Sequence, residues 1–183
     1  MSQTLATAPE RALDPRLAGL KRIAIIPAYN EAESIASVIQ EVRRADADLH
    51  VVVIDDGSAD RTGRIAARAG ARVVRLPFNL GIGGAMQTGY QYARDHGFQV
   101  AVQIDGDGQH DPFQVPQLFG PILDDRADLV IGSRFVGKGG YRSKLARRIG
   151  IRLFARAVSL IIRQRVTDAT SGFRAANRRA ICL

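Results

Sequence analysis

The sequence has 183 residues, enough for one domain that buries a core without disulfides, and its single cysteine, Cys182, favours a reducing cytoplasmic setting. Its formal net charge of +8 is compatible with nucleic acid, anionic lipid or phosphorylated substrates as partners. No apolar run approaches the ~18 to 20 residues that a transmembrane helix needs, and residues 1–20 lack the apolar stretch of a secretory signal, so we expect a chain that does not span a membrane.

Along the chain, a polar start gives way to regular alternation. Residues 1–21 show no sustained periodicity, which predicts a mobile N-terminal arm before a domain over residues 22–183. Short apolar runs then predict strands at 22–27, 51–55, 71–76, 98–105 and 128–133. Between them, helices are predicted over 31–45, 60–69, 83–96 and 112–125, the last broken by prolines, and Asn30 is placed to cap the first helix.

Repeated units of strand and helix predict an α/β fold with a mainly parallel sheet and right-handed crossovers. Ligands of such sheets bind at the carboxyl ends of the strands. Two acidic stretches, VVVIDDGSAD at 51–60 and VAVQIDGDGQ at 100–109, fall at strand ends of this kind. We therefore expect a binding site at that edge of the sheet.

The second acidic stretch is a candidate metal site. Asp105 and Asp107 can direct hard oxygen ligands to one point, with Gln109 as a third, and Mg²⁺ or Mn²⁺ held in this way keeps positions open for substrate phosphates. An EF-hand is excluded because its sixth and twelfth positions would be His110 and Pro116 instead of Gly and Glu. Taken alone, the stretch is also compatible with an acidic turn in solvent.

The glycines of NLGIGGAMQTGY, residues 79–90, do not form a dinucleotide fingerprint, because Met86 stands where the pattern requires its last glycine. Backbone amides at a helix start attract phosphate, so the stretch could still approach an anion. Tight packing of the helix against the sheet would explain the glycines equally well.

Six motifs in order make the sequence recognisable. They are PAYNE (27–31), VIDDGSADRT (53–62), NLGIGGA (79–85), DGDGQH (105–110), GSRF (132–135) and DATSGFR (168–174). Together they resemble the family 2 inverting glycosyltransferases of the GT-A fold, and within them the dolichyl- or polyprenyl-phosphate sugar synthases. The resemblance covers about residues 22–178. Relatives usually continue beyond the position of Leu183, so we expect the acceptor side to be incomplete here, or completed by self-association or a membrane partner.

The resemblance implies a donor site for a GDP- or UDP-hexose. Its nucleoside would lie against Pro27, Tyr29, Glu31 and Asp56. The DxD pair, Asp105 and Asp107, together with Gln109, would hold Mg²⁺ or Mn²⁺ against the donor diphosphate. These residues also have ordinary structural explanations, such as packing for Tyr29 and a helix N-terminal acid for Glu31.

On the acceptor side, the resemblance places Arg134 at the phosphate of a lipid acceptor, with Arg147, Arg148 and Asp168 as further candidates. A lipid phosphate is already anionic and needs no general base, whereas a hydroxyl acceptor must lose a proton. Asp168, His110 and Asp111 are the candidate bases, although His110 is expected mainly to support the metal loop. The arginines would reduce the repulsion between the donor diphosphate and the acceptor phosphate.

The region 138–166 carries nine Lys or Arg residues and no acid. Within it, Arg148, Arg152 and Arg156 are spaced as on one face of a helix beside apolar residues, so the helix could lie in a membrane interface. An ordinary helix docked on the core with a solvated basic face is equally compatible. Nucleic acid is disfavoured because the region has few aromatic residues and no recognised module.

The sequence thus predicts a cytoplasmic enzyme, peripheral at the inner face of a membrane, that moves a hexose to a polyprenyl phosphate. A family 2 enzyme acting on a hydroxyl acceptor, either a polysaccharide or a small molecule, is one alternative. A non-catalytic module that binds nucleotide sugars is the other.

Overall fold

The computed structural model describes residues 14–132 and 171–183. Within these residues, six strands form one sheet: β1 (Arg22–Ala28), β2 (His50–Asp55), β3 (Arg72–Arg75), β4 (Val100–Gln103), β5 (Leu129–Ile131) and β6 (Arg174–Asn177). The helices are α1 (Ile35–Ala45), α2 (Thr62–Arg68), α3 (Gly81–Asp95), α4 (Val115–Leu123) and α6 (Arg178–Ile181). Two short 3-10 turns, η1 (Pro15–Leu17) and η2 (Pro112–Gln114), complete the described elements.

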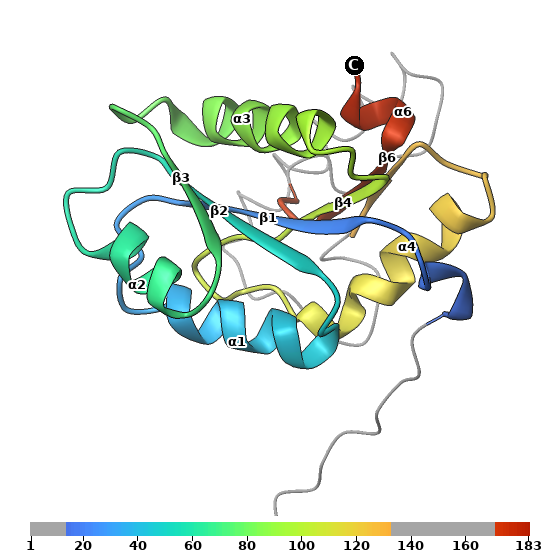
Figure 1. Cartoon of the computed structure of the whole chain (residues 1–183), viewed down its shortest axis with the longest axis horizontal. Helices are drawn as coiled ribbons and strands as arrows, with labels where there is room; N and C mark the ends of the chain where they lie inside the picture. The colour runs from blue at the N-terminus through green and yellow to red at the C-terminus, as the bar shows by residue number, and fades with distance from the viewer. Residues whose placement is uncertain (1–13, 133–170) are drawn as a thin grey trace, which may run out of the picture.

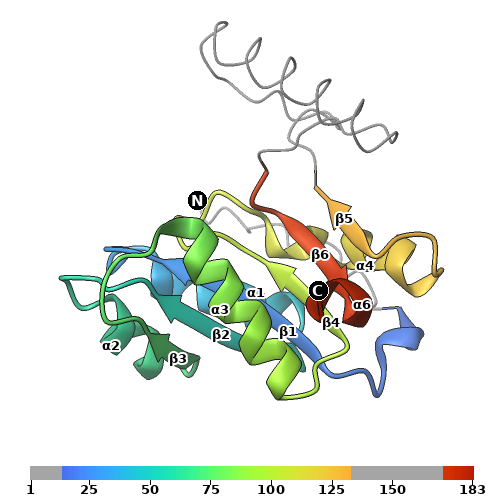
Figure 2. The same ribbon diagram turned by 90° about the horizontal axis from the view of Figure 1, so that it is seen from above.

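The sheet has the order β3-β2-β1-β4-β6-β5. Strands β1 to β4 pair in parallel, which confirms the predicted parallel arrangement. Strand β6 is antiparallel to both β4 and β5 and lies between them, as Figure 2 shows. It was not predicted as a strand, because its sequence RAAN has no β-branched or aromatic residue and its partners are distant in sequence.

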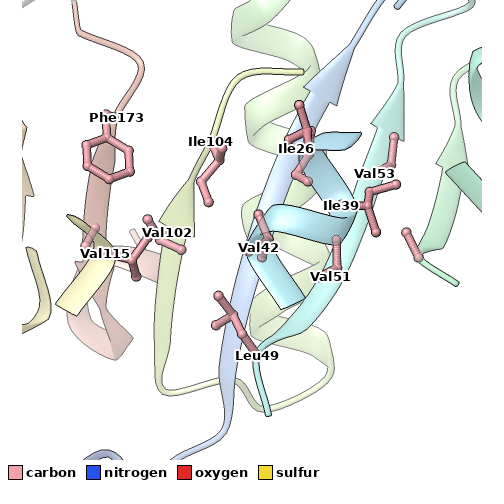
Figure 3. Packing of buried hydrophobic residues seen from close by; sticks show 14 of the residues in the cluster. Ile26, Ile39, Val42, Leu49, Val51, Val53, Val102, Ile104, Val115 and Phe173 are labelled. Carbon is pink, nitrogen blue, oxygen red and sulfur yellow. The ribbon is translucent and has the colours of Figure 1, made fainter. Parts of the chain in front are cut away.

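Helices cover both faces of the sheet. In Figure 1, α3 and α6 lie on one face and α1, α2 and α4 on the other. Strand β1 is buried along its whole length and contributes alternate side chains to two hydrophobic clusters, with Ile26 toward α1 and Ile25 toward α3. Burial on both faces explains why the strands read as continuous apolar runs. Figure 3 shows the larger cluster, where Ile39 and Val42 of α1 pack on the sheet.

The predicted N-cap of the first helix is wrong. Helix α1 begins at Ile35 with Ser34 in the cap position, and Asn30 has a left-handed backbone with a φ of 56°. Asn30 instead binds the loop after β2: its Oδ1 accepts the Ala59 N–H at 2.9 Å, and its own N–H donates to Ser58 Oγ at 3.0 Å. The PAYNE turn is therefore fastened to the neighbouring acidic loop before the helix starts.

Part of the predicted N-terminal arm belongs to the packed domain. Residues 14–21 include η1, and Leu17 is 1% exposed within the larger hydrophobic cluster. The Arg22 guanidinium donates to the Leu17 carbonyl and forms a buried ion pair with Asp46 at 2.9 Å. Residues 1–13 lie outside the described residues. In the described part of the chain, no helix is both long enough and apolar enough to cross a membrane.

Candidate functional site

A cleft opens at the carboxyl edge of the parallel strands, where the sequence predicts a site. It has a volume of about 320 Å³. Its lining residues come from the ends of β1, β2 and β4 and from the start of α3: Pro27, Ala28, Tyr29, Glu31, Asp56, Asn79, Gly81, Ile82, Ala85, Asp105, Gly106 and Asp107. The structure thus brings the four predicted nucleoside residues and two of the three predicted metal ligands, Asp105 and Asp107, into one cavity.

The PAYNE turn forms the wall that follows β1. The Glu31 N–H donates to Thr62 Oγ1 at 2.8 Å, and the Glu31 carboxylate accepts from Ser34 Oγ at 3.0 Å. Ser34 Oγ also lies 2.7 Å from the Gly106 carbonyl oxygen, so the turn is linked to the DxD loop. Tyr29 is 48% exposed and lines the cleft, so it is not packed in the core.

The two acids that end β2 have different environments. Asp55 is 1% exposed: its Oδ1 accepts the Ser58 N–H at 2.9 Å, and its Oδ2 faces the Arg75 guanidinium at 3.7 Å. Asp56 lines the cleft, and its Oδ1 accepts the Leu80 N–H at 2.8 Å. Asp55 therefore stabilises the loop, while Asp56, although only 4% exposed, is the acid of the two that lines the cleft.

Gly57 allows the loop after β2 to approach the start of α3. Its φ is 72°, and a Cβ at this position would lie 2.7 Å from the carbonyl carbon of Phe78. On α3 itself, a Cβ at Gly89 would overlap the side chain of Ile25 on β1. Helix packing therefore explains Gly89, whereas Gly81 lines the cleft. The packing explanation is confirmed at Gly89, and the approach of an anion to the glycine-rich stretch stays a prediction.

The Asp60 side chain fastens the start of α2 to the PAYNE turn. It accepts the N–H groups of Thr62 at 2.9 Å and of Ala32 at 3.2 Å. The Thr62 hydroxyl also donates to this carboxylate, and this hydrogen bond is the main reason that the pKa of Asp60 lies below its ordinary value. The loop is thus held by an ionised carboxylate at neutral pH.

The DxD loop follows β4. The Asp105 side chain is 33% exposed, and its Oδ1 accepts from Gln103 Nε2 at 3.1 Å. Asp107 is exposed, and its Oδ1 accepts the Gln109 N–H at 2.9 Å. Both carboxylates line the cleft, whereas Gln109 is not among its lining residues.

This donor set fits Mg²⁺ or Mn²⁺ that is shared with a substrate. Two carboxylates at a strand end are hard oxygen ligands, and Mg²⁺ commonly keeps its remaining positions for water and phosphate. Among the residues that the structure describes, no group of three or more His, Cys, Asp or Glu side chains could hold a metal ion. The described carboxylates would therefore hold the cation only partly, which leaves coordination to a diphosphate.

The C-terminal segment reaches the same loop. His110 Nδ1 accepts the Asp105 N–H at 3.2 Å, and the His110 ring lies 5.2 Å from the Phe173 ring, centroid to centroid. A Cβ at Gly172 would overlap the Asp105 carboxylate. Sequence reasoning missed Gly172 and Phe173: both stand in the DATSGFR motif, but nothing in their spacing connects them to Asp105.

The predicted acceptor residues Arg134, Arg147, Arg148 and Asp168 lie outside the described residues, as does the basic region 138–166. The described residues on either side of this gap are Gly132 and Ser171. The Gly132 N–H donates to the Phe173 carbonyl at 2.7 Å. The described residues on either side of this gap are therefore held together.

Comparison with known proteins identifies the sequence family. The protein-family model described as Glycosyl transferase family 2 matches residues 23–182. A polyprenol monophosphomannose synthase from Mycolicibacterium smegmatis is 32% identical over 168 residues, covering 88% of this chain and 63% of that protein. An undecaprenyl-phosphate mannosyltransferase from Micrococcus luteus is 35% identical over 165 residues, covering 85% of this chain and 66% of that protein. This chain thus spans less than two thirds of the length of either relative.

A solved structure shares the fold. It is glucosyl-3-phosphoglycerate synthase from Mycobacterium tuberculosis in complex with Mn²⁺, UDP-glucose and phosphoglyceric acid, with a TM-score of 0.70 and 27% identity. The match covers 95% of this chain and 64% of that one. The fold and the family therefore agree, while the acceptors that the names of these proteins give differ.

Proposed function

Because this chain belongs to glycosyl transferase family 2 and has the GT-A fold that its motifs predict, we propose that it moves a hexose from a nucleotide-diphospho-sugar to a polyprenyl phosphate. The observation that carries the proposal is the single cleft lined by Asp56 from the end of β2 and by Asp105 and Asp107 from the end of β4. A nucleoside site and a cation site separated by a short distance are what a nucleotide diphosphate requires.

In this proposal the donor lies along the carboxyl edge. Tyr29, Glu31 and Asp56 contact the nucleoside, while Asp105 and Asp107 hold Mg²⁺ or Mn²⁺ beside the diphosphate. When bound, the cation supplies Lewis acidity that opposes the negative charge building up on the departing nucleoside diphosphate. The complex of the mycobacterial relative with Mn²⁺ and UDP-glucose supports this arrangement. Both UDP and GDP remain candidate nucleotides.

The negative charge of the lipid phosphate determines how the acceptor would react. An oxygen of the lipid phosphate attacks the anomeric carbon from the face opposite the diphosphate, so the new C–O bond forms as the bond to the diphosphate breaks. The electron pair leaves with the nucleoside diphosphate and the anomeric configuration inverts. No proton has to be removed, and arginines such as Arg134, Arg147 and Arg148 would reduce the repulsion between the two anions.

A hydroxyl acceptor is the second candidate, because the mycobacterial relative was solved with phosphoglyceric acid. That reaction calls for a general base. Two of the candidate bases are already engaged. His110 Nδ1 accepts the Asp105 N–H, and the Asp111 carboxylate caps η2 by accepting the Phe113 N–H at 3.0 Å. This engagement favours the phosphate acceptor, with Asp168 left as the base candidate outside the described residues.

The proposed place of action is the cytoplasmic face of a membrane. The net charge of +8 and the nine cations of region 138–166 suit a surface of anionic headgroups. A peripheral protein of this kind would meet a lipid phosphate at the interface while its donor cleft stays open to nucleotide sugar from solution. Self-association or a membrane partner could complete the acceptor side.

Glycolipid formation tests the proposal. The full chain would be incubated with Mn²⁺, radiolabelled UDP-glucose or GDP-mannose, and liposomes that contain undecaprenyl phosphate, and the label would be followed into the organic phase. We expect transfer that requires the lipid phosphate and is abolished in Asp105→Asn. Product formed only on phosphoglyceric acid would support the hydroxyl acceptor. Metal-dependent nucleotide binding without any product would instead support a non-catalytic binding module.

A further inference from the structure

We propose that His110 is a positioning residue for the cation site, and that it acts by accepting the Asp105 backbone N–H. The inference rests on the proposed function, because it assumes that Asp105 binds Mg²⁺ or Mn²⁺. It assigns His110 no contact with the sugar or the acceptor.

Both nitrogens of the His110 ring face Asp105. Nδ1 lies 3.2 Å from the Asp105 backbone nitrogen, and Nε2 lies 3.7 Å from Asp105 Oδ2. Since Nδ1 accepts a hydrogen bond, the proton of the neutral ring is on Nε2, on the side of the carboxylate. The His110 side chain is only 12% exposed, so little space is left for other orientations of the ring. One side chain therefore holds the Asp105 backbone by a hydrogen bond and lies beside its carboxylate.

The C-terminal segment holds this ring in place. Phe173 is 7% exposed, belongs to the larger hydrophobic cluster and contacts the His110 ring at a centroid distance of 5.2 Å. Next to it, the absence of a side chain at Gly172 leaves the space that the Asp105 carboxylate occupies. Ser171 accepts the Phe173 N–H on its Oγ at 3.2 Å. The segment thus packs against His110 and Asp105 at the same time.

A third neighbour completes the restraint on Asp105. Gln103, which is 5% exposed on β4, donates from Nε2 to Asp105 Oδ1 at 3.1 Å. Asp107 differs, because it is exposed and accepts its hydrogen bond from Gln109 within its own loop. Asp105 is therefore the pre-organised ligand of the pair. Removing a neighbour that orients a metal ligand typically weakens metal affinity by about 10- to 100-fold.

Two amide substitutions at His110 separate the effect of the hydrogen-bond acceptor from the effect of losing the imidazole ring. Asn places its Oδ1 where the imidazole has Nδ1, so His110→Asn keeps an acceptor for the Asp105 N–H, whereas His110→Gln places its oxygen one bond further out. The affinity of each full-length variant for Mn²⁺ would be measured from the EPR signal of free Mn²⁺, with and without UDP or GDP. Urea denaturation would establish that each variant is folded.

We expect His110→Asn to bind Mn²⁺ within about threefold of the wild type and His110→Gln to bind about tenfold more weakly or worse. His110→Ala should resemble His110→Gln if it folds, but the two amides decide the matter without it. Equal Mn²⁺ affinities for His110→Gln and the wild type, or an Asn variant as weak as the Gln variant, would overturn the inference alone. Failure of the wild type to bind Mn²⁺ with either nucleotide would overturn the proposed function and this inference with it.

Discussion

The Asp56 carboxylate accepts a hydrogen bond from the backbone N–H of Leu80 at 2.8 Å, which ties the end of β2 to the start of α3 across the wall of the cleft. Its neighbour Asp55 is turned into the protein and binds the Ser58 N–H. Of these adjacent acids, Asp56 lines the cleft and Asp55 holds the loop, and substitutions can tell them apart.

Asp56→Ala should weaken nucleotide binding by at least about tenfold, because a hydrogen bond to a charged group contributes about 1.5–3 kcal/mol. The free energy of unfolding should also fall, by about 1–3 kcal/mol, because the Leu80 N–H loses its acceptor. Asp55→Ala is the matched control: it leaves a buried Ser58 N–H and the Arg75 guanidinium without their partner, so it should mainly lower stability. Calorimetric titration and urea denaturation of both variants measure the two effects. Equal losses of binding and stability in the two variants would contradict this division.

Gly57→Ala should destabilise the protein more than Gly97→Ala does. The two glycines have φ angles of 72° and 70°, so each substitution carries the cost of a left-handed backbone, about 1–2 kcal/mol. At Gly57 the new Cβ would also meet the backbone of Phe78 and Asn79, whereas nothing lies within 4 Å at Gly97. Chemical denaturation checks the difference. A Gly97 variant that is equally or less stable would show that the loop after β2 does not need this close approach.

The buried ion pair of Arg22 and Asp46 should contribute strongly to stability. Both side chains are 4% exposed, so Asp46→Ala leaves an uncompensated buried guanidinium, which typically costs about 3–5 kcal/mol. Asp48 is the control: it lies 3.9 Å from the same Arg22 but is 88% exposed, and Asp48→Ala should cost less than about 0.5 kcal/mol. Urea denaturation midpoints give both values. Similar losses for the two variants would refute the importance of burial here.

Stability should fall between about pH 7.5 and pH 5.5 in a way that depends on His50. Burial, and then the charges of His96, Arg43 and Arg72, lower the pKa of His50 from 6.5. The unfolded chain then binds a proton at His50 more readily than the folded protein, so the free energy of unfolding decreases as pH falls through 6.5 toward the lower folded pKa. The wild type should lose more stability than His50→Gln over this range. Identical pH slopes for the two proteins would contradict the shift.

The sequence predicted the parallel half of the sheet and the edge at which the cleft lies, because apolar runs ending in acids mark strand ends directly. It did not predict β6, whose pairing with β4 and β5 depends on contacts between distant segments. Nor could it predict that Asn30 would bind the loop after β2, since helix capping and loop binding use the same side-chain oxygen. Both the pairing of β6 and the contact of Asn30 depend on segments that are distant in sequence and close in the fold.

The candidate site shows the same division. The motifs placed Asp56, Asp105 and Asp107 at one cleft, because the strands that they follow, β2 and β4, both pair with β1. The support of the metal loop by His110 was expected, whereas the contact of Asp105 with Gly172 was beyond sequence reasoning, since it depends on where the segment before β6 packs.

The central claim is that the cleft binds a nucleoside diphosphate through a divalent cation, and calorimetric titration of UDP and GDP tests it most directly. Each nucleotide would be titrated into the wild type and into Asp107→Ala, first with Mn²⁺ and then with excess chelator. We expect one nucleotide to bind with Mn²⁺, to lose most of its affinity with chelator and to lose it equally in the variant. Absence of binding by both nucleotides in Mn²⁺, or metal-dependent binding unchanged in Asp107→Ala, would contradict the account.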